Sequence, residues 1–109
     1  MRKPHTYSPM AVEAGRLLGN TVRVARRERR WTVEELAERV GVNHGTIRKV
    51  ERGDLSVGLG PAFEAAALLG VPLFDDDARR RSLEAARIAD RLAVLPERVR
   101  RPVNVGNDF

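Results

Sequence analysis

The strongest constraint on the fold of this 109-residue chain is a pair of closely spaced helix start and stop signals. Thr32, with Glu35 three residues later, has the capping-box pattern that begins a helix, and Gly41 ends that helix after about two turns. Asn43 is a strong N-cap for a second short helix, which Gly53 ends. The sequence therefore predicts two short helices joined by a three-residue turn.

Further helices are predicted on both sides of this pair, which makes the expected fold all-α. A Ser-Pro pair supplies an N-cap and a first-turn proline for a helix over 10–30, although Gly15 and Gly19 are expected to loosen its first turns. Pro61 marks the start of a fourth helix, and consecutive aspartates precede a fifth over roughly 77–94. The apolar stripes of these three helices are Leu18, Val22 and Ala25, then Leu59, Phe63, Ala66 and Leu69, then Ala85, Ile88, Ala89, Leu92 and Leu95.

The predicted organisation is one small helical domain between two extended ends. Residues 1–8 are expected to form a flexible basic arm because they contain a proline, two cations and no apolar periodicity. Residues 9–95 would form the domain, with the two short helices at 32–53. Residues 96–109 contain two prolines and a basic cluster without helical periodicity, and we expect them to form an extended tail.

Composition excludes several classes of function. The chain has no cysteine and only two histidines, so we expect no disulfide, zinc site or thiol nucleophile, no bound metal and no cofactor. No nucleophile, base and orienting group can be assembled, so we do not expect an enzyme. Because the sequence lacks a long apolar run and a signal-peptide pattern, a cytoplasmic protein without a membrane partner is expected.

The charge of the chain is concentrated near its start. The formal net charge is +5, and residues 1–31 carry eight of the cations but only two of the anions. A run of arginines is often only a solvated surface, and by itself it favours neither that interpretation nor electrostatic attraction to nucleic acid.

Two short helices joined by a turn that contains glycine have the geometry of a helix-turn-helix, whose second helix fits the major groove of DNA. If Ile47 and Val50 face the core, the start and the opposite face of that helix are free to approach base edges. The candidate base-reading residues are His44, Gly45, Arg48 and Lys49. The candidate phosphate-binding residues are Thr32, Thr46, Arg52, Arg23 and Arg27. Double-stranded operator DNA is therefore the expected partner.

The sequence also resembles a known family over about residues 16–74. The marks ELAERVGV, TIRKVERG and LLGVPL are similar to those of the lambda-repressor-like, Cro/C1 (XRE) helix-turn-helix domain. The resemblance implies a domain of about five helices, base contacts from the third helix and dimerisation on palindromic operators. It also implies a structural ion pair between Arg26 and Glu51. Val33 departs from the pattern, because the family often has a glutamine there that contacts DNA.

A narrower resemblance is to HipB-like regulators. The arginine-rich first helix, the loop ERGDLSVGLG and the segment LPERVRRP are similar to that group. This implies an antitoxin that binds its own operator as a dimer and holds a HipA-type kinase toxin. The alternatives are a stand-alone or phage-type repressor, or a protein-interaction subunit built on a helix-turn-helix scaffold.

The fifth helix is the candidate dimer element. Its apolar residues Ile88, Leu92 and Leu95 could pack on their own domain or on a second subunit, and the twofold symmetry of operators favours a homodimer.

Overall fold

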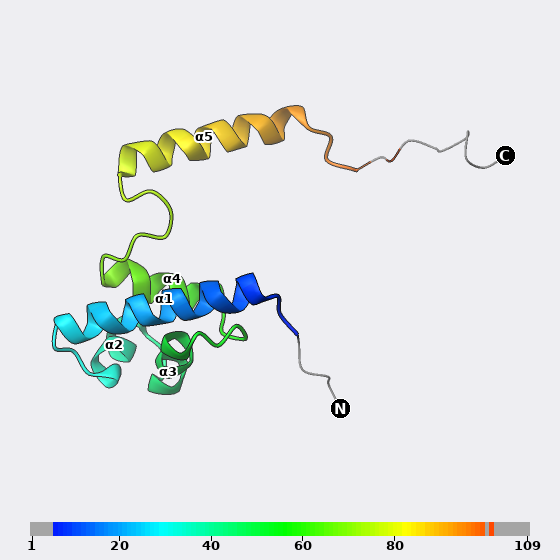
Figure 1. Cartoon of the computed structure of the whole chain (residues 1–109). Helices are drawn as coiled ribbons and strands as arrows, with labels where there is room; N and C mark the ends of the chain where they lie inside the picture. Colours follow the sequence, from blue (N-terminus) through cyan, green and yellow to red (C-terminus); the bar gives the residue numbers. More distant parts are fainter. Residues whose placement is uncertain (1–5, 100, 102–109) are drawn as a thin grey trace. The chain divides into compact units, whose positions relative to one another are not determined.

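The structure, a computed structural model, describes residues 6–99 and 101 (Figure 1). The described residues form five helices and no strand, which confirms the predicted all-α fold. The helices are α1 (Pro9–Glu28), α2 (Val33–Val40), α3 (His44–Arg52), α4 (Leu59–Leu68) and α5 (Ala78–Val94).

The helices belong to two compact units. The first unit ends at Leu73 and contains α1 to α4, and the second begins at Phe74 and contains α5. The predicted domain over 9–95 therefore spans both units. No described helix is long and apolar enough to cross a membrane.

Local capping explains where the helices begin and end. The Thr32 hydroxyl accepts from the amide of Glu35 at 3.0 Å, and the Glu35 carboxylate accepts from the amide of Thr32 at 2.9 Å. Asn43 caps α3 by accepting from the amide of Thr46 at 2.9 Å. Gly41 ends α2 in the left-handed conformation, with a φ of 88°, which costs glycine little because it has no Cβ.

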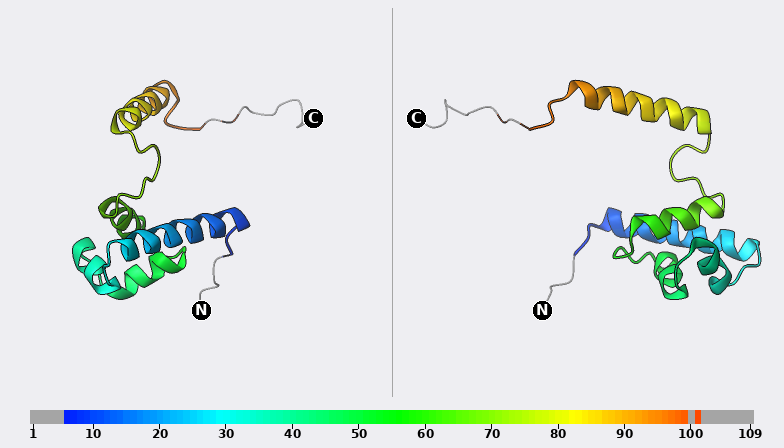
Figure 2. Two further views of the ribbon diagram at one scale, coloured as in Figure 1. Left: turned by 60° about the vertical axis from the view of Figure 1, so that its left-hand side comes forward. Right: turned by 180° about the vertical axis from the view of Figure 1, so that it is seen from behind.

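The core of the first unit lies between its four helices. In Figure 1, α2 and α3 lie below α1, and both views of Figure 2 show α3 in the same relation to α1. Val22, Leu36 and Ile47 are its largest fully buried side chains. The other buried hydrophobic residues are Ala37, Val50, Ala62, Ala65, Ala66 and Leu69.

Gly15 and Gly19 bring α1 and α3 together instead of loosening α1. The helix is continuous from Pro9, and α3 crosses it so closely that a Cβ added at Gly19 would lie 2.5 Å from the carbonyl oxygen of Val50. A Cβ at Gly15 would lie 2.9 Å from the carbonyl oxygen of Gly53. Only glycine leaves room for these backbone contacts, so the two residues position the helix that carries the candidate DNA-reading face.

The predicted apolar stripe of α4 was wrong in part. Ala66 and Leu69 are buried as predicted, but Leu59 is 70% exposed and Phe63 is 39% exposed. Alanines fill the rest of the buried face. Because α4 is apolar on nearly every side, its sequence pattern does not indicate which face is buried, and the small side chains let α2 and α3 approach closely.

Candidate nucleic-acid interface

The face of α3 turned away from the core carries the predicted base-reading residues. Ile47 is fully buried and Val50 is 3% exposed, and both belong to the core cluster. His44, Arg48 and Lys49 are exposed, and their spacing of four and one places them on the other side of the helix. The structure thus brings these three side chains together on one surface at the start and middle of α3.

Gly45 lies beside this surface, at the beginning of α3. It is partly buried, and a Cβ added there would be 3.1 Å from the Asn43 side-chain oxygen that caps the helix. A residue without a side chain at this position keeps the helix start open to a ligand and leaves the cap undisturbed.

An ion pair that sequence reasoning missed connects this surface to α2. An Arg48 guanidinium nitrogen lies 3.2 Å from a Glu34 carboxylate oxygen, and both side chains are exposed. Exposed pairs of this kind contribute roughly 0–1 kcal/mol, so a phosphate or guanine can displace the carboxylate at little cost. No sequence signal indicated the pair, because its partners are far apart in the chain and meet only when α2 packs against α3.

Two of the predicted phosphate-binding residues, Thr32 and Thr46, already make hydrogen bonds at the starts of α2 and α3. The backbone amide and hydroxyl of Thr32 both serve the capping box, and the Thr46 hydroxyl donates to Asn43 at 3.2 Å. Hydrogen bonding from the Thr32 amide holds the pKa of Glu35 below its usual value.

Arg52 is exposed at the end of α3, 3.9 Å from an Asp54 carboxylate oxygen. Hydrogen bonds from Ser56 lower the pKa of that carboxylate.

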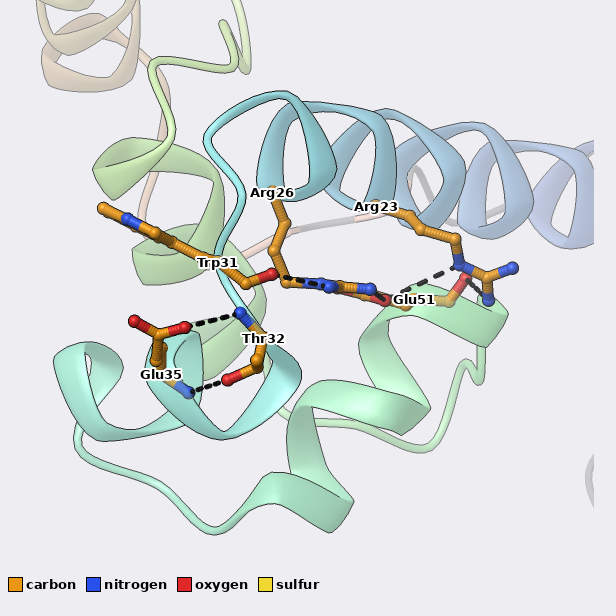
Figure 3. A network of polar contacts seen from close by, with 6 residues as sticks. All are labelled: Arg23, Arg26, Trp31, Thr32, Glu35 and Glu51. Carbon is orange, nitrogen blue, oxygen red and sulfur yellow. Dashed lines mark hydrogen bonds and ion pairs between the residues drawn. The ribbon is translucent and has the colours of Figure 1, made fainter.

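The two predicted phosphate-binding arginines of α1 differ in their surroundings. Arg27 is exposed. Arg23 is about one-third exposed, and its guanidinium donates to the backbone carbonyl of Glu51 at 3.1 Å (Figure 3). Arg23 therefore fixes α1 to the end of α3 in the structure, a contact that its spacing in the sequence did not indicate.

Arg26 and Glu51 form a buried, two-pronged ion pair between α1 and α3 (Figure 3). The Arg26 Nε and Nη2 atoms donate to the two carboxylate oxygens at 2.6 and 3.0 Å, and Nη1 donates to the backbone carbonyl of Trp31 at 2.8 Å. The hydrogen bond to Glu51 raises the pKa of Arg26. Because both groups are rigidly held, the pair fixes the orientation of α3 relative to α1.

The turn between α1 and α2 carries an aromatic residue that contacts two cations. The Trp31 ring has the guanidinium of Arg39 at 4.2 Å and that of Arg29 at 5.3 Å from its centre. Such contacts are attractive because the ring face is electron-rich. Arg29 also donates to the backbone carbonyl of Leu68 at 2.9 Å, so the end of α1 is fastened to the end of α4.

Comparison with known proteins identifies the class of domain. Residues 22–75 match the family model described as helix-turn-helix, and this match includes α2, α3 and α4 and all the buried hydrophobic residues of the first unit's core. Over these residues the chain is similar to helix-turn-helix domains of the Cro/C1 (XRE) type, the type found in DNA-binding transcription regulators. A search of curated proteins and a search of solved structures each found no match to the chain.

Proposed function

We propose that the chain is a sequence-specific transcription regulator that reads operator DNA with α3. The observation that carries this proposal is the exposed face of His44, Arg48 and Lys49, which lies opposite the buried Ile47 and Val50. A helix with one side fixed in a core and a cationic side free can enter the major groove without disturbing the fold.

Each residue of this face has a chemical role in the proposal. Arg48 and Lys49 donate to O6 and N7 of guanine, and His44 donates or accepts at the end of the helix that reaches the base edges first. Gly45 lets the backbone approach the DNA closely. Displacement of Glu34 from Arg48 is the local rearrangement that binding requires.

The phosphate contacts are proposed for residues around this face. Thr32 and Thr46 lie at the starts of α2 and α3, where the helix dipole favours an anion. Arg52, Arg27 and Arg23 add positive charge that attracts the duplex without reading its sequence. Arg23 lies beside Glu51 and is partly exposed, so it adds this charge without leaving its contact with α3.

Substitutions that separate base reading from phosphate binding test the proposal. Sites selected from a random DNA pool are compared with unselected DNA. Arg48→Ala or Lys49→Ala is expected to cost about 1–3 kcal/mol of binding free energy at the selected site and little on unselected DNA. Arg27→Ala is expected to weaken binding to the selected site and to unselected DNA by the same factor. It should also reduce the salt dependence of the affinity by the equivalent of about one phosphate contact.

Arg79→Ala, an exposed change in α5, serves as the matched control and should leave the preference for the selected site unchanged. Equal losses on both DNAs for Arg48→Ala and Lys49→Ala would show that these residues touch only phosphate. Selection that enriches no sequence would contradict the proposal itself.

The HipB-like role stays a prediction from the sequence resemblance. It adds a kinase-type toxin as a partner and the chain's own promoter as the operator. Purification of the tagged chain from native cells at physiological salt, with identification of bound protein and DNA, tests it. A kinase together with the promoter supports an antitoxin, whereas promoter DNA without a protein partner supports a stand-alone repressor.

A further inference from the structure

One residue of the first unit holds a backbone conformation that its side chain disfavours. Among the described residues, Arg30 is the only residue other than glycine with a positive φ, at 59°. The other left-handed positions are occupied by Gly41, Gly53 and Gly70. This conformation is unfavourable for a residue with a Cβ, because the Cβ then lies too close to the following carbonyl oxygen. An arginine at this position therefore destabilises the fold relative to glycine.

Hydrogen bonds on both sides of Arg30 impose the left-handed conformation. The amide of Arg30 donates to the carbonyl of Arg27 at 2.9 Å. The amide of Trp31 donates to the carbonyl of Arg26 at 3.1 Å, and the Trp31 carbonyl accepts from Arg26 Nη1 at 2.8 Å. The chain can leave the left-handed conformation only by breaking these bonds, so the surrounding structure maintains it.

The fold gains no contact from the Arg30 side chain in return. This side chain is exposed, and within the part of the chain that the structure describes its guanidinium makes no hydrogen bond, ion pair or ring contact. Neighbouring arginines differ, because Arg26 pairs with Glu51 and Arg29 donates to the carbonyl of Leu68. Arg30 thus combines an unfavourable backbone with a cation that the fold does not use, which points to a role outside the fold.

We propose that Arg30 binds a phosphate of the DNA backbone. The inference rests on the proposed function, because it requires DNA against α2 and α3. In a helix-turn-helix the first helix crosses the DNA backbone while the second enters the major groove. Arg30 lies two residues before Thr32, the cap of α2, and therefore beside the helix that crosses. The amide and hydroxyl of Thr32 already bond to Glu35, so the Arg30 guanidinium supplies donors that the cap itself lacks.

This role gives a physical reason for arginine at a position that favours glycine. DNA binding gains a charge-assisted contact that carries no sequence information, while the fold loses stability. Stability and DNA affinity are therefore expected to change in opposite directions when Arg30 is replaced by glycine. An arginine that is only solvated would change the stability and leave the affinity as it was.

Arg30→Gly in the full chain tests the proposal with two measurements. The thermal midpoint is expected to rise by about 4–8 °C, because glycine adopts the left-handed conformation readily. The affinities for the selected site and for unselected DNA are both expected to fall about three- to tenfold at moderate salt. The slope of log affinity against log salt concentration should become shallower by about 0.9, the equivalent of one phosphate contact.

Two control variants separate the charge from the backbone. Arg30→Lys keeps both the cation and the left-handed Cβ, so it should shift the midpoint by less than about 2 °C and the affinity by less than about threefold. Gly41→Ala adds a Cβ at a left-handed position, where it meets no heavy atom within 4 Å apart from its chain neighbours. This change should lower the midpoint by about 4–8 °C, in the direction opposite to Arg30→Gly.

Unchanged DNA affinity in Arg30→Gly would overturn the phosphate contact, and so would a loss confined to the selected site. An equal loss in Arg30→Lys would overturn the role of the charge. A midpoint that does not rise in Arg30→Gly would overturn the opposition between stability and affinity. Failure of the proposed function is distinguishable, because selection that enriches no sequence contradicts base reading by α3. Weaker binding of Arg30→Gly to unselected DNA would support the phosphate contact even then.

Discussion

The unit that contains α1 to α4 and the helix α5 are built from similar residues but are stabilised in different ways. In the first unit, each helix contributes buried residues to one core, and Arg26 and Glu51 add a buried ion pair. In α5, which is richer still in alanine, leucine and arginine, no residue is buried. Its support comes from the Asp77 cap and pairs such as Arg87 with Glu84. Amphipathic spacing therefore predicts that a helix forms, and contacts with other elements decide how much its formation contributes to global stability.

The largest expected difference between the two regions comes from the buried ion pair. Glu51→Ala leaves the Arg26 guanidinium buried without its partner, which is expected to lower the free energy of unfolding by about 3–5 kcal/mol in chemical denaturation. The double variant Arg26→Met with Glu51→Leu should lie closer to wild type than Glu51→Ala, because it removes both charges. A loss below 1 kcal/mol for Glu51→Ala would show that the pair is open to water.

The crossing of α1 and α3 gives the next largest effect. Gly19→Ala places a Cβ against the carbonyl oxygens of Val50 and Glu51, and it is expected to cost about 1–3 kcal/mol of unfolding free energy. Gly60→Ala in α4 is the control, since a Cβ there meets no heavy atom within 4 Å apart from its chain neighbours. The control should have a smaller effect than Gly19→Ala, because the helix preference of alanine and the crowding of its Cβ by the following Pro61 oppose each other. Equal effects at the two positions would contradict the close crossing.

The smallest expected effect on stability comes from removing one helix cap in each of the two regions. Thr32→Ala removes the cap of α2 and is expected to cost about 1 kcal/mol of the free energy of global unfolding. Asp77→Ala removes the cap of α5, whose side chain accepts from the amides of Arg79 and Arg80. It should lower the amide-exchange protection of α5 and leave the unfolding midpoint of the core unchanged. If both variants shift that midpoint equally, the two regions unfold as one.

The start and end of α2 and α3 could be predicted because the signals are local, whereas α4 begins at Leu59, two residues before the predicted Pro61, and α1 ends at Glu28, two residues before the predicted end at residue 30. Thr32, Asn43 and Asp77 each bond to amides two or three residues away, so their roles are written within a short stretch of sequence. The exposed face of α3 followed from the apolar spacing of Ile47 and Val50. The resemblance to Cro/C1 domains supplied the pairing of Arg26 with Glu51, which no local pattern contains.

Other features depended on how the helices pack. The buried face of α4 could not be deduced from its spacing because most of its residues are apolar. The role of Gly19 depends on the backbone of α3, and the contact of Arg48 with Glu34 depends on the packing of α2. Each of these features joins residues that are distant in the chain.

By itself, the sequence determined that the chain is helical, where α2 and α3 begin and end, and which residues of α3 lie on its exposed face. Capping bonds and apolar periodicity act within one or two helical turns, so they can be recognised without knowing the fold. Only the tertiary structure decided that alanines of α4 fill the core and that Arg23 is fixed beside Glu51. It also decided that glycines of α1 leave room for the backbone of α3 to pack closely against it. These depend on shape and distance between separate helices, which close packing determines for the unit as a whole.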